Sequence, residues 1–448
     1  MNEQLFLFNL PEHLEEANQT IISHSKPRLK TAHRNQIEFV SSCIDDLIPE
    51  DHPARNIWDF ISQMDLSPIL NKIQSTESGP GRPAIDPKIL LSLWVYAITE
   101  GIGSARVIDR YCNEHFAFKW LCGGVKVNYH TISDFRKSNS QEFDDLIAIF
   151  IARLIDKKLV SLKRVSQDGT KVRASAGSSS FRRKPTLNEL LKESKEQVAI
   201  LRNEIDGDPS SCTNREVAAK KRAKIDRQQR LEQALSEHKK AVIEKGKSKK
   251  KNRKTFTKKE KDAMRTSTTD PEARKMKMAN GGFNPAYNLQ LAVDTESRYI
   301  VGINTTNKGN DFGELEKMMN QIETRYNIVP EEFLVDQGYL EHEVIVKAKK
   351  KNCKVYVNPR KEKDEKNAFL PHPGEAKELS DWRIRMGLDE SKKIYKDRAS
   401  NSEWANAGLK NRGLKQLLVR GIEKVKSVFS LHVLTHNILR SLHLNYSW

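Results

Sequence analysis

The sequence predicts a mixed α/β fold, in which a five-stranded sheet follows an all-α domain and a helical, lysine-rich insertion comes after its first strand. Helical periodicity dominates residues 36–140, and strand and helix patterns alternate after residue 141. A polar, lysine-rich stretch separates the first strand from the others. Alternating strands and helices are typical of an α/β sheet, and the interruption indicates an inserted module.

The first 140 residues are predicted to form a flexible lead, residues 1–35, and a helical domain, residues 36–140. Capping residues, prolines and glycines divide this domain into short helices, as at Asp86-Pro87. Short helices joined by glycine turns in a basic chain favour a helix-turn-helix-like DNA-binding domain, and an ordinary helical bundle is the alternative. The candidate DNA contacts here are Asn128, His130, Arg136 and Lys137.

Residues 141–175 are predicted to supply a helix and the first strand of the sheet. Apolar residues recur at helical spacing over 143–155, and residues 159–166 alternate as a strand does. This strand is expected to end at Asp168-Gly169. Because Asp-Gly is also a strong hairpin signal, a turn is the alternative to a carboxylate at the end of a central strand.

Residues 176–278 are predicted to be an insertion made of a helical hairpin and a basic segment. Apolar residues follow 4-3 spacing over 187–205, and a weaker apolar stripe runs over 216–238. Residues 245–261 are almost devoid of apolar side chains, so we expect them to be flexible unless they meet phosphate. So dense a run of positive charge favours contact with nucleic acid over an ordinary solvent-exposed surface. The DNA contacts expected in this run are Lys249, Lys250, Lys251, Arg253 and Lys254.

Residues 279–420 are predicted to complete the sheet, and residues 421–448 to form a C-terminal helix. The expected strands are 287–294, 299–303, 332–335 and 354–357, with helices over 311–326 and 340–349. Residues 360–390 show no periodicity that assigns them a role. From residue 394 the pattern is helical, and glycines divide it into two or three helices.

The composition indicates a polyanionic partner and a reducing compartment. The 77 Lys and Arg residues outnumber the 59 Asp and Glu residues, leaving a net charge of +18, which favours nucleic acid as the partner. The five cysteines lie far apart with no C-x-x-C pair, which argues against a zinc site or a disulfide framework. No secretory signal is visible, and the most apolar run, residues 89–98, is too short to span a bilayer. We therefore expect a cytoplasmic protein without membrane contacts.

Two carboxylates are predicted to meet at one edge of the sheet. Asp336 follows the apolar pair Leu334-Val335, and Asp168 follows the first strand. In a sheet of order 3-2-1-4-5 the first and fourth strands are neighbours, so the two side chains converge. A capping or turn role is the alternative for Asp336. Because two Mg²⁺ ions held by acidic oxygens can support phosphoryl transfer, with Mn²⁺ as an alternative, this edge is the predicted active site.

A third carboxylate is expected from a helix that passes the same edge. Glu403 is chosen over the other acids between residues 389 and 423, because basic residues share its helix at useful spacing. Lys410 follows seven residues later, about two turns, and so lies on the same face. The alternative for Glu403 is a solvated glutamate paired with a lysine.

Four motifs stand out together: Asp168-Gly169-Thr170-Lys171, Tyr287-Asn288-Leu289-Gln290 with Ala292-Val293-Asp294, Asp336-Gln337-Gly338-Tyr339, and Tyr395-x-x-Arg398 followed by Glu403 and Lys410. In combination they resemble the DDE transposases of bacterial insertion sequences, in the branch marked by a Tyr-Arg-Glu-Lys signature. The resemblance covers roughly residues 36–175 and 267–442. None of these motifs is specific alone, but their combination is.

The resemblance implies an RNase H-like catalytic domain, Mg²⁺-dependent nicking at transposon ends with two ions, and strand transfer by the freed 3′-hydroxyl. It also implies double-stranded DNA as partner and a homodimer on that DNA. The implied catalytic residues and metal ligands are Asp168, Asp336 and Glu403, and the implied phosphate contacts near them are Tyr395, Arg398 and Lys410.

Two features depart from the family pattern. Four residues separate Arg398 from Glu403, whereas the best-known signature has three, and the large insertion follows the first strand. Three functions stay open: a transposase that binds the terminal inverted repeats of its element, an RNase H-like nuclease that only hydrolyses DNA, and a catalytically inert DNA-binding regulator of transposition.

Overall fold

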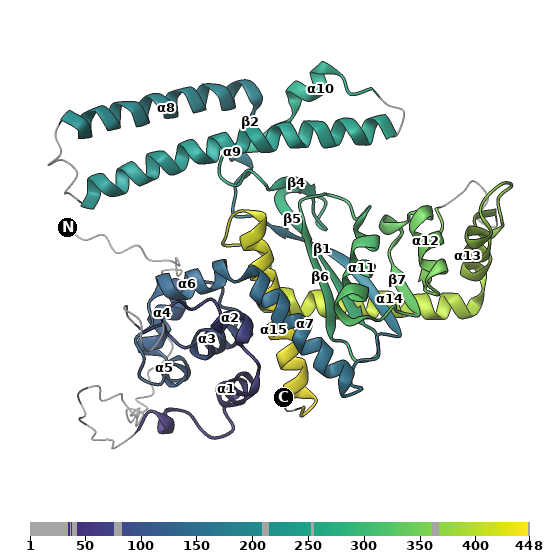
Figure 1. The fold of residues 1–448 in the computed structure, drawn as a ribbon, viewed down its shortest axis with the longest axis horizontal. Coiled ribbons are helices and arrows are strands. Elements are labelled where there is room, and N and C mark those ends of the chain that lie inside the picture. Colours follow the sequence, from purple (N-terminus) through teal and green to yellow (C-terminus); the bar gives the residue numbers. More distant parts are fainter. Residues whose placement is uncertain are drawn as a thin grey trace, which may run out of the picture. The chain divides into compact units, whose positions relative to one another are not determined.

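The computed structural model describes residues 43–75, 83–207, 215–251, 255–360 and 367–446, together with 35 and 37 (Figure 1). Within helices, the side chains at 202, 204–207, 215–217, 248–251 and 367 are not described. The expected lead, except residue 35, and the candidate contacts Arg253 and Lys254 lie outside the described residues. The described residues from Cys43 onward belong to one compact unit.

Short helices precede the sheet, as the sequence predicts: α1 (Pro53–Gln63), α2 (Ser67–Leu70), α3 (Pro87–Thr99), α4 (Ala105–Glu114), α5 (Phe116–Cys122) and α6 (Tyr129–Ser138). The Asp86 side chain caps α3 by accepting from the Lys88 N–H, and Pro87 is the first helical residue. Asn128 caps α6 in the same way, accepting from the Thr131 N–H at 3.0 Å. Among the described residues, no helix is long and apolar enough to cross a membrane.

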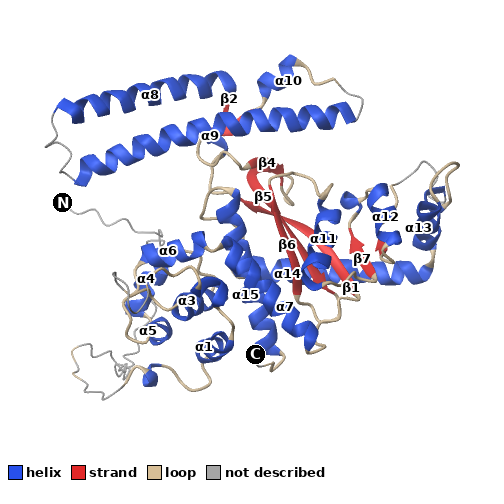
Figure 2. Ribbon diagram, viewed as in Figure 1, coloured by secondary structure: helices blue, strands red, loops and turns tan. Residues whose placement is uncertain are grey.

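The sheet has the predicted order. Its strands are β1 (Arg164–Arg173), β4 (Arg274–Lys277), β5 (Phe283–Asp294), β6 (Ile300–Thr306), β7 (Glu332–Val335) and β8 (Lys354–Tyr356), red in Figure 2. The path β6-β5-β1-β7-β8 is the order 3-2-1-4-5, with β1 antiparallel to β5 and parallel to β7. The short β4 pairs with the start of β5, so the part of the sheet that follows the insertion begins within the range expected for the insertion. This mixed α/β architecture is that of an RNase H-like domain with added helical regions.

Different helices cover the two faces of β1. On one face, α11 (Glu314–Tyr326) packs against β6, and the Gln167 amide donates to the Glu314 carbonyl at 3.3 Å. On the other face lies α14 (Asp389–Asn411), where the hydroxyls of Ser166 and Ser402 are 3.0 Å apart. Successive strand residues point to opposite faces, so residue 168 shares the α14 face with Ser166.

The remaining helices pack around this frame. They are α7 (Ser140–Asp156), α12 (His342–Lys350), α13 (Lys377–Gly387) and α15 (Ile422–His443). α7 and α15 pack against each other and against β6, and α12 packs against β8. α13 lies in the range 360–390, for which the sequence predicts no element.

The insertion contains the predicted helical hairpin, α8 (Lys184–Gly207) and α9 (Arg215–Lys251), which run side by side in Figure 1. Leu187, Leu231 and Ala234 form its buried contact. At the base of the hairpin, β2 (Phe181–Arg183) pairs with β3 (Arg265–Ser267), which follows α10 (Lys258–Ala263). The run over 245–261, expected to lack regular structure, is helical in part, because α9 continues to Lys251 and α10 begins at Lys258. The physical reason is that lysine has good helix propensity even where its charge is dense.

Candidate active site

Asp168 and Asp336 occupy adjacent positions on neighbouring parallel strands. The pairing of β1 with β7 ends at Gln167 and Val335. Asp168 is the next residue of β1, and Asp336 is the residue that directly follows β7. Residues in register on adjacent strands point to the same face, about 5 Å apart. The two carboxylates are therefore neighbours, on the side of the sheet that α14 covers.

The expected strand end at Asp168 is wrong. β1 continues to Arg173, because β5 pairs with it as far as the register Arg173–Ala286. Asp168-Gly169 is thus no hairpin turn. Instead, Asp168 lies where β7 ends and β5 continues, so one edge of β1 is open beside a carboxylate in mid-strand.

Burial disfavours the charge of Asp168, although an amide donates to its carboxylate. Its Oδ2 accepts a hydrogen bond from the Asn406 amide of α14 at 3.0 Å. Burial raises the pKa of Asp168 to about 6, helped by the nearby Asp311 and Asp336 carboxylates and opposed by the Gly169 N–H and Arg398. Carboxylates that crowd one another in this way are stabilised by a cation between them.

Asp336 is exposed, and local hydrogen bonds hold its backbone. Its Oδ1 accepts a hydrogen bond from the Gln337 N–H at 2.7 Å. Asp336 therefore has the capping role that the sequence offered as an alternative, and this role does not exclude metal binding. The Tyr395 hydroxyl donates to the carbonyl of Val335, one residue earlier, at 3.2 Å. Tyr395 therefore supports the end of β7, which Asp336 directly follows.

Arg398 lies near both Tyr395 and Asp168. Its guanidinium is 5.5 Å from the centre of the Tyr395 ring, and its charge lowers the pKa of Asp168. Its Nε is buried and has no hydrogen-bond partner in the described part of the chain. The structure thus brings together Asp168, Asp336, Tyr395 and Arg398 from the predicted set.

Glu403 and Lys410 lie on α14, yet neither shows a contact with these acids. Ser402 and Asn406, on either side of Glu403 in sequence, face β1, while Glu403 itself is exposed. Lys410 is half-buried, about two turns further on. Across the described ranges, no three His, Cys, Asp or Glu side chains are arranged to hold a metal ion. The oxygen donors of Asp168 and Asp336 suit Mg²⁺, whereas Glu403 would have to turn inward to join them.

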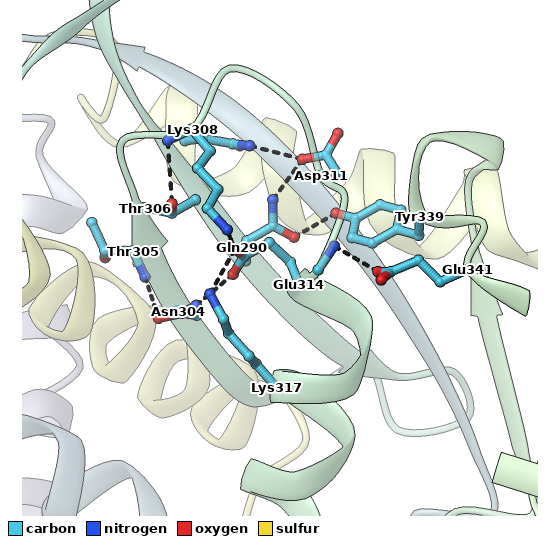
Figure 3. A network of polar contacts seen from close by, with 12 residues as sticks. Gln290, Asn304, Thr305, Thr306, Lys308, Asp311, Glu314, Lys317, Tyr339 and Glu341 are labelled. Atoms are coloured by element: carbon cyan, nitrogen blue, oxygen red, sulfur yellow. Dashed lines mark hydrogen bonds and ion pairs between the residues drawn. The ribbon is translucent and has the colours of Figure 1, made fainter. Parts of the chain in front are cut away.

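A buried polar network lies on the opposite face of the sheet, and the sequence-based site did not include it (Figure 3). The amides of Asn288 and Gln290 each donate to Oδ1 of Asp311 at 2.7 Å. Gln290 Oε1 in turn accepts from the Tyr339 hydroxyl and from the Gln167 amide. Since Gln167 precedes Asp168 and Tyr339 ends the turn after Asp336, the network connects the backbones that carry both acids.

Gly169 makes this network possible. A Cβ at position 169 would lie 2.5 Å from Nε2 of Gln290 and 2.6 Å from Oδ1 of Asp311. Any side chain there would displace the Asp311 carboxylate from the strand. The signal in the sequence was the pair of amides at alternate positions of Tyr287-Asn288-Leu289-Gln290, which resembled the polar face of an ordinary strand.

The predicted DNA contacts outside this site are less supported. Arg136 is buried, with its guanidinium 4.5 Å from the centre of the Trp94 ring and Nη1 2.6 Å from the Gly103 carbonyl oxygen. A DNA contact on the outer surface of the helical domain is therefore not favoured for this side chain. Lys249, Lys250 and Lys251 lie at the end of α9, where their side chains are not described.

Comparison with known proteins identifies the family. Residues 42–138 match the family model described as Transposase domain (DUF772), and residues 257–438 match the one described as Transposase DDE domain. The second match includes Asp336 and Glu403, while Asp168 lies between the two matched segments. No curated protein and no solved structure matches the chain. Both matched segments, which together cover more than half of the sequence, name the same activity, and the chain belongs to the DDE transposases.

Proposed function

We propose that this transposase binds the terminal inverted repeats of its element and cuts and joins DNA strands with two divalent ions at Asp168, Asp336 and Glu403. The observation that carries the proposal is the register of β1 and β7, which makes Asp168 and Asp336 neighbours on one face. The net charge of +18 supports a DNA substrate. By resemblance, the protein acts as a homodimer on DNA, and we place it in the cytoplasm.

The side chains at this edge of the sheet have different roles. Asp168 and Asp336 would hold the metal ions, which supply Lewis-acid activation of the attacking hydroxyl and stabilise the leaving oxygen. Asn406 fixes the Asp168 carboxylate, and Tyr395 supports the strand end before Asp336. Glu403 would complete the ligand set once it turns from solvent towards these acids.

The basic residues of α14 would meet the DNA. The buried Nε of Arg398 has no hydrogen-bond partner among the described residues, and Arg398 lies close to Asp168. We therefore expect Arg398 to donate to a phosphate oxygen of the DNA. Lys410 lies further along the same helix and would neutralise a neighbouring phosphate. Both cations would offset the charge of the DNA backbone as it approaches two carboxylates.

Cleavage of a duplex that carries the element's terminal repeats tests this function. We expect Mg²⁺-dependent nicking by the native chain and at least a hundredfold loss in Asp336→Asn. Asp389→Asn, at the exposed start of α14, is the matched control and should cleave normally. Full cleavage by Asp336→Asn would refute the assignment.

The same assay separates the alternatives. Joined products as well as nicks identify a transposase, and nicks alone identify a nuclease. Binding of the repeats without any cleavage by the native chain identifies an inert regulator. Nicks and joined products are read from the length of the labelled strand on a denaturing gel, and binding is read from the mobility of the intact duplex on a native gel.

We further propose that the apolar seam over residues 187–205 of the hairpin mediates self-association or braces DNA, while the basic residues 245–261 contact the DNA backbone. The hairpin can be deleted without breaking a strand, because Arg183 and Arg265 are paired at its base. A two-residue Asn-Gly turn can replace residues 184–264 and close the ribbon. Unchanged DNA affinity and unchanged oligomeric state in this variant would contradict the proposal.

A further inference from the structure

A pocket of about 260 Å³ lies between the N-terminal helices and the segment that joins α14 to α15. Trp94 of α3 and Arg136 of α6 form one side, and residues 413–418 with His432 of α15 form the other. Gly413 has a φ of +93°, and a Cβ there would lie 3.0 Å from the Gly101 carbonyl oxygen, so only glycine suits this rim. No carboxylate is found among the lining residues.

Arg136 carries a charge into this pocket without a carboxylate partner. It is 7% exposed, and no ion pair to it is found in the described part of the chain. Its neighbours are the Trp94 ring and the Gly103 carbonyl, while Nε has no hydrogen-bond partner among described residues. Burial alone lowers its pKa, to about 10. Buried guanidinium groups are normally paired with an anion, and no carboxylate of the described residues pairs with Arg136.

His432 adds a second unsatisfied group to the same wall. It is 6% exposed, and its Nδ1 has no partner within the described ranges. Burial, together with the charges of Arg136 and Arg412, lowers the pKa of His432 to about 3, so its ring is neutral at pH 7. A neutral ring can donate one N–H to a ligand. Lys415 is exposed at the same pocket, so three basic side chains line it.

We propose that this pocket is an oxyanion site that takes a single phosphate group, with Arg136 and His432 as donors and Lys415 at the mouth. The choice of phosphate rests on the proposed function, since a DNA-handling chain meets phosphate as its principal oxyanion. The shared chemistry allows two sources, a phosphate of the DNA backbone and free inorganic phosphate. In either case the ligand ties together the two segments that match transposase families.

The first experiment uses inorganic phosphate as the probe. Thermal unfolding of the full chain is followed without DNA or metal, at constant ionic strength, while phosphate replaces chloride. We expect a saturable rise in Tm for the native chain that is lost in Arg136→Met, which keeps an unbranched apolar stem. Arg110→Met, at an exposed arginine of α4, is the matched control and should keep the full response.

A second variant guards against loss of folding in Arg136→Met. Lys415→Gln changes an exposed residue, and it should raise the phosphate concentration at half-effect several-fold. Phosphate responses in Arg136→Met and Lys415→Gln that equal the native one would overturn the proposal. So would a native chain that does not respond to phosphate.

DNA binding then identifies the source. If a backbone phosphate enters the pocket, the slope of log affinity against log salt falls by about one in Arg136→Met. If the slope is unchanged while the phosphate response is lost, the ligand is free phosphate. Because neither arm measures cleavage, failure of the pocket and failure of the proposed catalytic function are distinguishable.

Discussion

Replacing Asp168 by Asn should stabilise the metal-free protein. The raised pKa means that the folded state binds this proton more tightly than the unfolded chain does, so ionisation of Asp168 weakens the fold. The penalty is absent below the ordinary pKa of 3.8 and complete above about 6. A shift of roughly two units corresponds to about 3 kcal/mol at pH 7 and about 1.5 kcal/mol at pH 5. The Asn side chain has the same shape as the Asp side chain, and its oxygen can still accept the hydrogen bond from the Asn406 amide.

Denaturant unfolding in the presence of EDTA at pH 7 and pH 5 measures this gain. Asp156→Asn, at an exposed position ending α7, should change the free energy of unfolding by less than about 0.5 kcal/mol at either pH. Added Mg²⁺ should stabilise the native chain more than Asp168→Asn, because the variant lacks a ligand. A variant that is less stable than the native chain at pH 7, or equally stabilised at both pH values, would refute the reasoning.

Three further predictions concern the same edge of the sheet. Gln290→Leu leaves its buried partners unpaired and should cost about 3 kcal/mol in unfolding free energy, measured in urea, and also slow cleavage. Gly169→Ala should abolish cleavage and destabilise by more than about 2 kcal/mol, whereas Gly177→Ala, whose Cβ meets nothing closer than 3.4 Å, should change unfolding by under about 0.5 kcal/mol. Arg398→Met removes a charge that lowers the pKa of Asp168, so the acidic limb of the cleavage–pH profile should move to higher pH; an unmoved limb would count against their proximity.

The strands and the mixed sheet were predictable from apolar alternation, whereas the order 3-2-1-4-5 was the condition under which Asp168 and Asp336 converge. The neighbour relation of Asp168 and Asp336 followed from that order, and the structure confirms it. The continuation of β1 beyond Gly169 was not predictable from the local signal. Asp-Gly has the same appearance in a turn as in a strand, and only the length of β5 decides between them.

Other features depend on contacts between residues far apart in sequence. The burial of Gln290 requires both α11 and the missing side chain at Gly169, so its alternating pattern resembled a solvated strand face. Arg136 likewise looked like a surface cation of a helix, and its burial results from α15, nearly three hundred residues later. Glu403 lies on a helix, as the sequence predicts, but its side chain is exposed in the structure, and periodicity does not determine side-chain conformation.

Metal rescue of Asp336→Cys tests most directly whether Asp336 is a metal ligand in DNA cleavage. A thiolate is a poor ligand for Mg²⁺ and a better one for Mn²⁺. We expect no cleavage of terminal-repeat DNA by this variant with Mg²⁺ and restored cleavage with Mn²⁺, while Asp336→Ala stays inactive with either ion. Cleavage by Asp336→Ala with Mg²⁺ at the native rate would contradict it.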